Sequence, residues 1–171
     1  IGGTWSKEGT ILFTPQNSSA LYQVPARGGE AVQVTRVDPP RITGHWWSYF
    51  LPDSRHFLFF AWGSPGSTGV YLGSLDPKEQ PRRLFDSNSM AVFAPPDRVL
   101  YARQGALVAQ RLDLDKLEPD GEPVTVAESV IVRGLCGYCA AFSTSAAGPI
   151  AYRARGPERQ LVWVDRSGHE I

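Results

Sequence analysis

Residues 50–59 read Phe50-Leu-Pro-Asp-Ser-Arg-His-Phe-Leu-Phe59, an aromatic residue followed by a polar turn and a short apolar run. Pro, Asp and Ser are common in tight turns because each favours a turn conformation of the backbone. The segments on either side, 45–50 and 57–59, are rich in aromatic residues, as β-strands are. This stretch therefore predicts an antiparallel hairpin whose turn lies at 51–55.

The same pattern occurs three more times along the chain. The other copies are Trp5-Ser-Lys-Glu-Gly-Thr-Ile-Leu-Phe13, Phe93-Ala-Pro-Pro-Asp-Arg-Val-Leu-Tyr101 and Phe142-Ser-Thr-Ser-Ala-Ala-Gly-Pro-Ile-Ala-Tyr152. Their first aromatic residues, at positions 5, 50, 93 and 142, are 45, 43 and 49 positions apart. This period is close to the roughly 40–50 residues of one four-stranded propeller blade. We expect four repeats, over about 1–40, 41–86, 87–128 and 129–171.

Each repeat continues with strand-like segments in the same order. A second series of β-branched and aromatic segments lies at 21–24, 70–73, 107–110 and 161–164. A third series lies at 31–35, 82–85 and 123–126. With the strand before each aromatic marker, for example 45–50 and 89–93, every repeat has four strands. The prediction is an all-β chain of about four four-stranded antiparallel units, the last of them incomplete.

Composition excludes several other classes of protein. Lys and Arg number 17 and Asp and Glu also number 17, so no basic excess points to a nucleic-acid partner. The 17 Gly and 14 Pro argue against a helical bundle, and the best helical candidate, 112–117, is ended by Pro119 and Gly121. No apolar run approaches the roughly 18 residues of a membrane span, so we expect no membrane insertion by this chain. Because it starts at Ile1 without Met, we also expect a piece of a longer protein.

The turns 50–54, 5–9 and 93–97 resemble the aromatic-Ser-Pro-Asp-Gly hairpin of TolB-like, WD-type β-propeller repeats. In that family this turn joins the innermost strand of a blade to the next strand outward. The resemblance implies a partial β-propeller. Four blades without closure would leave apolar faces uncovered, and we expect self-association through the open blade edges.

A narrower resemblance lies in segments 117–128, 150–153 and 161–168. They are similar to the C-terminal propeller region of bacterial transmembrane serine/threonine protein kinases, as found in acidobacteria. The chain has no Gly-rich phosphate loop, His-Arg-Asp or Asp-Phe-Gly of its own. The resemblance therefore implies a non-catalytic module for ligand sensing or protein docking, on the extracytoplasmic (periplasmic) side of the membrane. A gating propeller of a peptidase and a TolB-like cell-envelope interaction protein stay open as alternatives.

Cys136 and Cys139 form a Cys-x-x-Cys pair, the only cysteines of the sequence. The tetrapeptide resembles the redox site of bacterial disulfide isomerases, but that chemistry needs the first Cys at the start of a helix. Strand-like residues surround this pair instead, so a local structural disulfide or a pair of buried thiols is favoured. A zinc site would need a second pair of ligands.

No other motif predicts a catalytic centre, a cofactor or a metal site. The acidic run 113–122 lacks the ligand spacing of a calcium loop, and His45, His56 and His169 lie in different repeats. No Gly-x-Ser-x-Gly elbow supplies a nucleophile.

The aromatic residues Trp46, Trp47, Tyr49 and Trp62 are the remaining candidates for a binding surface. Aromatic rings at such a position can stack on sugars or peptides. Strand alternation places Trp46 and Trp47 on opposite faces of one strand, which favours filling of the core.

Overall fold

A computed structural model describes residues 2–133, 138–145, 147–154 and 167 of the chain. The expectation of an all-β chain is confirmed, because every regular element of the described residues is a strand. The described part of the chain accordingly contains no helical segment with the length and apolar character of a membrane span.

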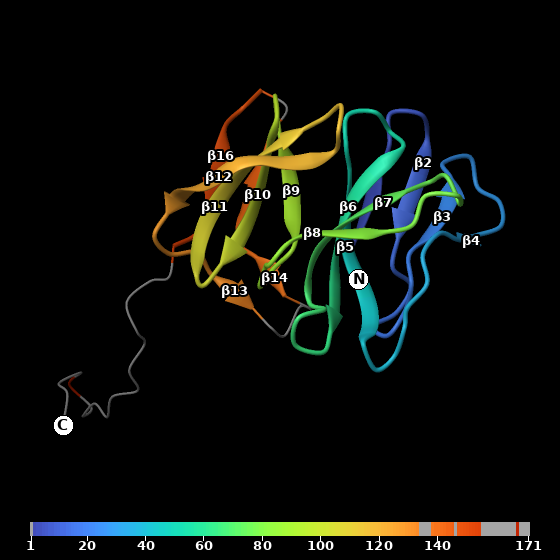
Figure 1. The fold of residues 1–171 in the computed structure, drawn as a ribbon, viewed down its shortest axis with the longest axis horizontal. Helices are drawn as coiled ribbons and strands as arrows, with labels where there is room; N and C mark the ends of the chain where they lie inside the picture. The colour runs from blue at the N-terminus through green and yellow to red at the C-terminus, as the bar shows by residue number, and fades with distance from the viewer. Residues whose placement is uncertain (1, 134–137, 146, 155–166, 168–171) are drawn as a thin grey trace.

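Three consecutive four-stranded antiparallel sheets make up most of the described structure, each with its strands in chain order. The first sheet consists of β1 (Gly3–Trp5), β2 (Thr10–Phe13), β3 (Tyr22–Pro25) and β4 (Val32–Gln33). The second consists of β5 (Ile42–Phe50), β6 (His56–Gly63), β7 (Gly69–Ser74) and β8 (Arg82–Phe85). The third consists of β9 (Ala91–Ala94), β10 (Arg98–Arg103), β11 (Ala106–Asp113) and β12 (Glu118–Ala127). In Figure 1 the second sheet lies between the other two.

The last part of the chain is built differently from this pattern. β13 (Val132–Arg133) pairs with β14 (Cys139–Ala140), and β15 (Phe142–Thr144) pairs with β16 (Ile150–Tyr152). The segment around Phe142, expected as a single strand, thus contributes to two small sheets, and Ala141 lies between them: its N–H donates to the carbonyl of Ile131 and its carbonyl accepts from the Arg153 N–H. The strand expected at 161–164 lies outside the described residues.

The aromatic marker of each repeat occupies the same position in its hairpin. The residues that stand opposite each other are Trp5 and Ile11 in the first sheet, Phe50 and Phe57 in the second, and Phe93 and Val99 in the third. The turn residues between them differ, but the pairing register is the same. The paired residues are 6, 7 and 6 positions apart in the three hairpins, so the second turn absorbs one additional residue without changing which positions pair.

The core lies between consecutive sheets. Leu12 of β2 and Leu21, directly before β3, pack with Phe57 and Phe59 of the second sheet. Leu58, on the other face of β6, packs toward the third sheet. At the same interface Phe85 of β8 stacks on Tyr101 of β10, with ring centroids 4.8 Å apart. Because side chains alternate along β6, both faces of the second sheet are buried. The strands that begin each sheet also touch in sequence, β1 with β5 and β5 with β9.

Candidate functional site

Trp46 and Trp62 lie together in an aromatic cluster on one face of the second sheet. Their rings stack with centroids 5.6 Å apart, and Tyr138 stacks on Trp46 at 6.2 Å. Trp46 is buried and its Nε1–H donates to the carbonyl of Asn17 over 2.6 Å, whereas Trp62 is 37% exposed. Trp46 is therefore a core residue, and Trp62 covers it from the solvent side.

Trp47 lies apart from this cluster because the backbone of β5 is irregular there. The register shifts by one residue between Trp46 and Tyr49, and Trp47 adopts a left-handed conformation with φ of 56°. This is a β-bulge, which re-aims a side chain relative to plain alternation. The Trp47 ring packs at Gly2, where an added Cβ would lie 2.8 Å from it. The regular alternation of side chains that the sequence predicted for β5 is thus interrupted at Trp47. The Trp46 and Trp47 rings nevertheless have different neighbours, as expected.

Two adjoining pockets lie along the strands that begin the three sheets, and we call them together the inner groove. The first, of about 280 Å³, is lined by the three aromatic markers Trp5, Phe50 and Phe93 and by Tyr49. The second, of about 160 Å³, is lined among others by Tyr49 and Met90. Tyr49 borders both pockets. The inner groove therefore joins β1, β5 and β9, which are remote in sequence.

The chemistry of the inner groove is mainly apolar and aromatic. Among the described residues that line it, Lys7 alone carries a charge. Burial raises the pKa of the Tyr49 phenol, so its hydroxyl stays protonated at neutral pH and can donate or accept a hydrogen bond. Such a hollow, with apolar walls and few polar groups, is typical of a binding site for a small molecule or a peptide side chain.

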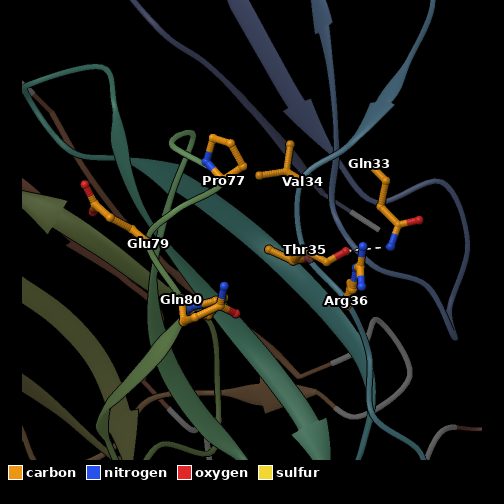
Figure 2. Close-up of a pocket in the computed structure, with 8 residues that line it drawn as sticks. Gln33, Val34, Thr35, Arg36, Pro77, Glu79 and Gln80 are labelled. Carbon is orange, nitrogen blue, oxygen red and sulfur yellow. Dashed lines mark hydrogen bonds between the residues drawn. The ribbon is translucent and has the colours of Figure 1, made fainter.

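A larger cleft of about 460 Å³ lies on the outer side, between residues of 33–36 and residues of 77–81 (Figure 2). Its buried polar residue, Thr35, is already engaged, because its hydroxyl accepts from the Leu21 N–H and contacts the His45 ring. Arg36 and Glu79 line the cleft as exposed side chains. Since only two sheets border this cleft and its polar core is used internally, we favour the inner groove.

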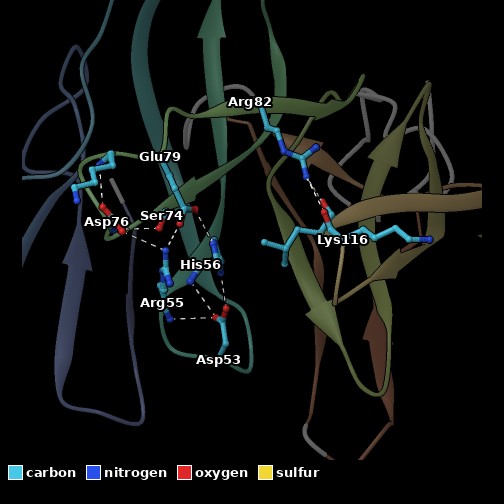
Figure 3. A network of polar contacts seen from close by, with 10 residues as sticks. Asp53, Arg55, His56, Ser74, Asp76, Glu79, Arg82 and Lys116 are labelled. Carbon is cyan, nitrogen blue, oxygen red and sulfur yellow. Dashed lines mark hydrogen bonds and ion pairs between the residues drawn. The ribbon is translucent and has the colours of Figure 1, made fainter.

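His56, between Asp53 and Glu79, forms the centre of a charged network beside this cleft (Figure 3). The Nε2 atom of His56 lies 2.9 Å from Glu79, and Arg55 pairs with both Glu79 and Asp76. The hydrogen bond to His56 and the charge of Arg55 hold the pKa of Glu79 below its ordinary value. These contacts connect the turn after β5 to the turn after β7, so we interpret the network as structural.

Asp53 shows two opposing influences on its carboxyl group. Partial burial raises its pKa, but the hydrogen bonds from the His56 ring and from the backbone of His56 and Arg55 outweigh burial and lower it. Figure 3 also shows Arg82 of β8, whose Nη2 donates to the carbonyl of Leu117 over 2.6 Å. This bond connects the second sheet to the β11–β12 turn of the third.

The other residues singled out in the sequence do not gather into a site. Cys136 lies outside the described residues, so the disulfide with Cys139 of β14 stays a prediction. His169 lies outside them too. The acidic run 113–122 forms the tip of the β11–β12 hairpin, where Asp113 accepts from the backbone N–H groups of Asp115 and Lys116. Within the described part of the chain, no three His, Cys, Asp or Glu side chains are grouped so as to hold a metal ion.

Lys7 and Met90 are lining residues that the sequence did not single out. Both lie close to an aromatic marker of the repeat, Lys7 two residues after Trp5 and Met90 three before Phe93. Proximity to a repeated marker is the signal that would have indicated them.

The chain matches no protein-family model, no curated protein and no solved structure at a significant level.

Proposed function

We propose that this chain is a non-catalytic binding module in which the three four-stranded sheets are consecutive blades of a partial β-propeller. One observation carries the proposal: Trp5, Phe50 and Phe93, the markers that define the repeat, line one pocket. Propeller blades are antiparallel four-stranded sheets arranged around a central channel, with their innermost strands nearest to it. The contacts of β1 with β5 and of β5 with β9 support that arrangement.

The ligand of the inner groove is a small molecule or peptide with an apolar or aromatic body. Trp5, Phe93 and the Tyr49 ring supply flat apolar walls, and Lys7 attracts an anionic or acceptor group at the rim. The pockets of about 280 and about 160 Å³ suit a ligand of modest size that lies along β5.

Ligand binding is tested by NMR titration of the ¹⁵N-labelled chain with aromatic carboxylates and short aromatic peptides. We expect amide shifts at Lys7, Tyr49 and Met90, and a Kd raised by roughly two- to tenfold in Tyr49→Ala, because an aromatic contact contributes about 0.5–1.5 kcal/mol. Tyr152→Ala is the matched control, since Tyr152 is an exposed tyrosine outside the groove. Shifts confined to other residues, or chemical turnover of a bound compound, would contradict the proposal.

The proposed setting is the extracytoplasmic part of a membrane-bound serine/threonine kinase. Its support is the resemblance of segments 117–128, 150–153 and 161–168 to the propeller region of such kinases. The reading frame that encodes the chain tests this setting. A kinase domain in the same frame supports it, whereas a peptidase domain supports a gating propeller and contradicts the kinase setting.

A further inference from the structure

Another hollow, of about 300 Å³, lies between the second and third sheets, where Arg83, Asn88 and Arg103 are among its lining residues, and we call it the polar pocket. Its walls come from the β6–β7 loop, from β8 and its connection to β9, and from the end of β10. Apart from Gly66, every described residue that lines it has a polar or charged side chain. It shares no lining residue with the inner groove, so it is a separate candidate site.

The connection between β8 and β9 forms a fixed wall of the polar pocket. Ser87 and Ser89 are both buried, and the Ser89 hydroxyl accepts from the Ala102 N–H of β10 over 2.9 Å. Asn88 stands between these two serines, and its own N–H donates to the carbonyl of Ala102 over 3.1 Å. The backbone at Asn88 is therefore held against β10, while its side chain is exposed at the pocket.

The orientation of the Asn88 amide follows from its contact with the next turn. The Gln104 N–H donates to Oδ1 of Asn88 over 3.0 Å. Because a backbone N–H can only donate, the atom that it meets must be the amide oxygen. Among the described residues, no group accepts a hydrogen bond from the NH₂ group of Asn88. Asn88 can therefore donate hydrogen bonds to a ligand without losing the contact that orients it.

Arg83 brings a guanidinium group to the pocket from the second sheet. Its Nη2 atom donates to the carbonyl of Thr68 over 2.7 Å and pairs with Asp86. Gly69 leaves room for this group, since an added Cβ would lie 3.0 Å from Nε of Arg83. Within the described part of the chain these bonds use Nη2, so the N–H groups of Nη1 remain available to a ligand.

Arg103 supplies a second positive charge, from the third sheet. It is the last residue of β10, directly before a two-residue turn in which Gln104 and Gly105 have φ of 52° and 86°. Positive φ at both positions is the geometry of a tight hairpin turn, which fixes the end of the strand. Burial raises the pKa of the Tyr101 phenol, and the Arg103 guanidinium beside it opposes that rise. Unlike Arg83, Arg103 forms no ion pair with a carboxylate of the described residues.

We propose that the polar pocket binds the oxyanion group, a carboxylate or a phosphate, of a small polar ligand. Its two guanidinium groups outnumber its one carboxylate, Asp86, so the lining has a net positive charge. Guanidinium N–H groups form charge-assisted hydrogen bonds with the oxygens of both anions, and the Asn88 amide adds neutral donors. Arg83 and Asn88 are already held by bonds to the protein, so binding orders few additional side chains.

The test is an NMR titration of the full ¹⁵N-labelled chain with sodium phosphate and, separately, with sodium succinate, at constant ionic strength. We expect saturable amide shifts at 66–68, 86–88 and 103–105 with at least one anion, and the tighter of the two identifies the oxyanion. Arg103→Gln should raise the Kd by about tenfold, because a hydrogen bond between charged groups is lost. Since neither anion has an aromatic body, this outcome is independent of binding in the inner groove.

Asn88→Asp separates the donor role of Asn88 from its structural role. The variant keeps an oxygen that accepts from the Gln104 N–H, but it replaces the NH₂ donor by an anionic oxygen. We expect the Kd to rise by more than about tenfold while the thermal unfolding midpoint is unchanged.

Arg27→Gln is the matched control, since Arg27 is an exposed arginine between β3 and β4 and its substitution removes the same charge away from the pocket. Binding weakened in Arg103→Gln and Asn88→Asp and kept in Arg27→Gln supports the proposal. No saturable binding of either anion, full binding in Asn88→Asp, or equal weakening in Arg27→Gln would overturn it.

Discussion

His45 makes the stability of this fold sensitive to mild acid. The residue is 3% exposed, and its ring lies edge-on to Phe59 with centroids 4.7 Å apart. The Oγ1 of Thr35 accepts from the Leu21 N–H over 2.9 Å and lies 2.8 Å from Nδ1 of His45. The hydroxyl and Nδ1 thus form a hydrogen bond in which either atom can be the donor, according to the imidazole tautomer. The folded chain therefore holds His45 neutral.

Burial lowers the pKa of His45 from 6.5 to about 4. As the pH falls below 6.5, the unfolded chain takes up a proton at His45 before the folded chain does. The contribution of the neutral His45 to the free energy of unfolding is therefore fully present above pH 6.5 and is lost progressively as the pH falls to about 4. The linkage relation gives a loss of about 2 kcal/mol between about pH 7 and about pH 5, rising to about 3 kcal/mol in stronger acid.

Urea unfolding at these two pH values measures the effect, with His45→Gln as the matched variant. A Gln side chain does not titrate and can still accept a hydrogen bond from Thr35. Because both proteins keep every other titratable group, the difference between their pH dependences isolates His45. We expect the wild type to lose about 2 kcal/mol more than His45→Gln. Equal losses in the two proteins would refute the neutral, buried state of His45.

Two further predictions concern a glycine of β7 and the turn between β5 and β6. Gly73→Ala should lower the free energy of unfolding by about 1–3 kcal/mol, because the new Cβ would overlap the Phe57 ring. The same substitution should cost much less in a Phe57→Leu background, and thermal unfolding measures both costs. Equal costs in the two backgrounds would rule out this overlap. Asp53→Ala should lower the free energy of unfolding by about 1 kcal/mol, with Asp53→Asn in between, because Oδ1 accepts the N–H groups of Arg55 and His56. An Asn variant as unstable as Ala, in chemical denaturation, would show that these backbone bonds contribute nothing.

Much of the strand layout could be predicted from the sequence because hairpins are local structures. The strand series at 70–73 and 82–85, for example, falls on β7 and β8. The division of the segment around Phe142 between β14 and β15 was not predictable, since β14 pairs with β13, which precedes it, whereas β15 pairs with β16, which follows it. The bulge at Trp47 likewise leaves no mark in the alternation of residue types.

The candidate site was predictable only in part. Trp46 and Trp47 are adjacent in sequence, yet one is a core residue of an aromatic cluster and the other packs at Gly2. Lys7 and Met90 lie close in sequence to the repeated markers Trp5 and Phe93, but that they line a shared groove depends on the contacts of β1 and β9 with β5.

The sequence by itself determined the all-β class, the period of about 45 residues and the position of the turns, because strand alternation and turn chemistry act over a few residues. Only the tertiary structure decided which faces meet. The same register position is an interior residue at Phe59 and a half-buried residue at Phe13, since the first sheet packs on Phe59 and, among the described residues, no sheet packs on Phe13. Burial depends on contacts between segments about 45 residues apart, so the inner groove results from the packing of sheets and not from any single repeat.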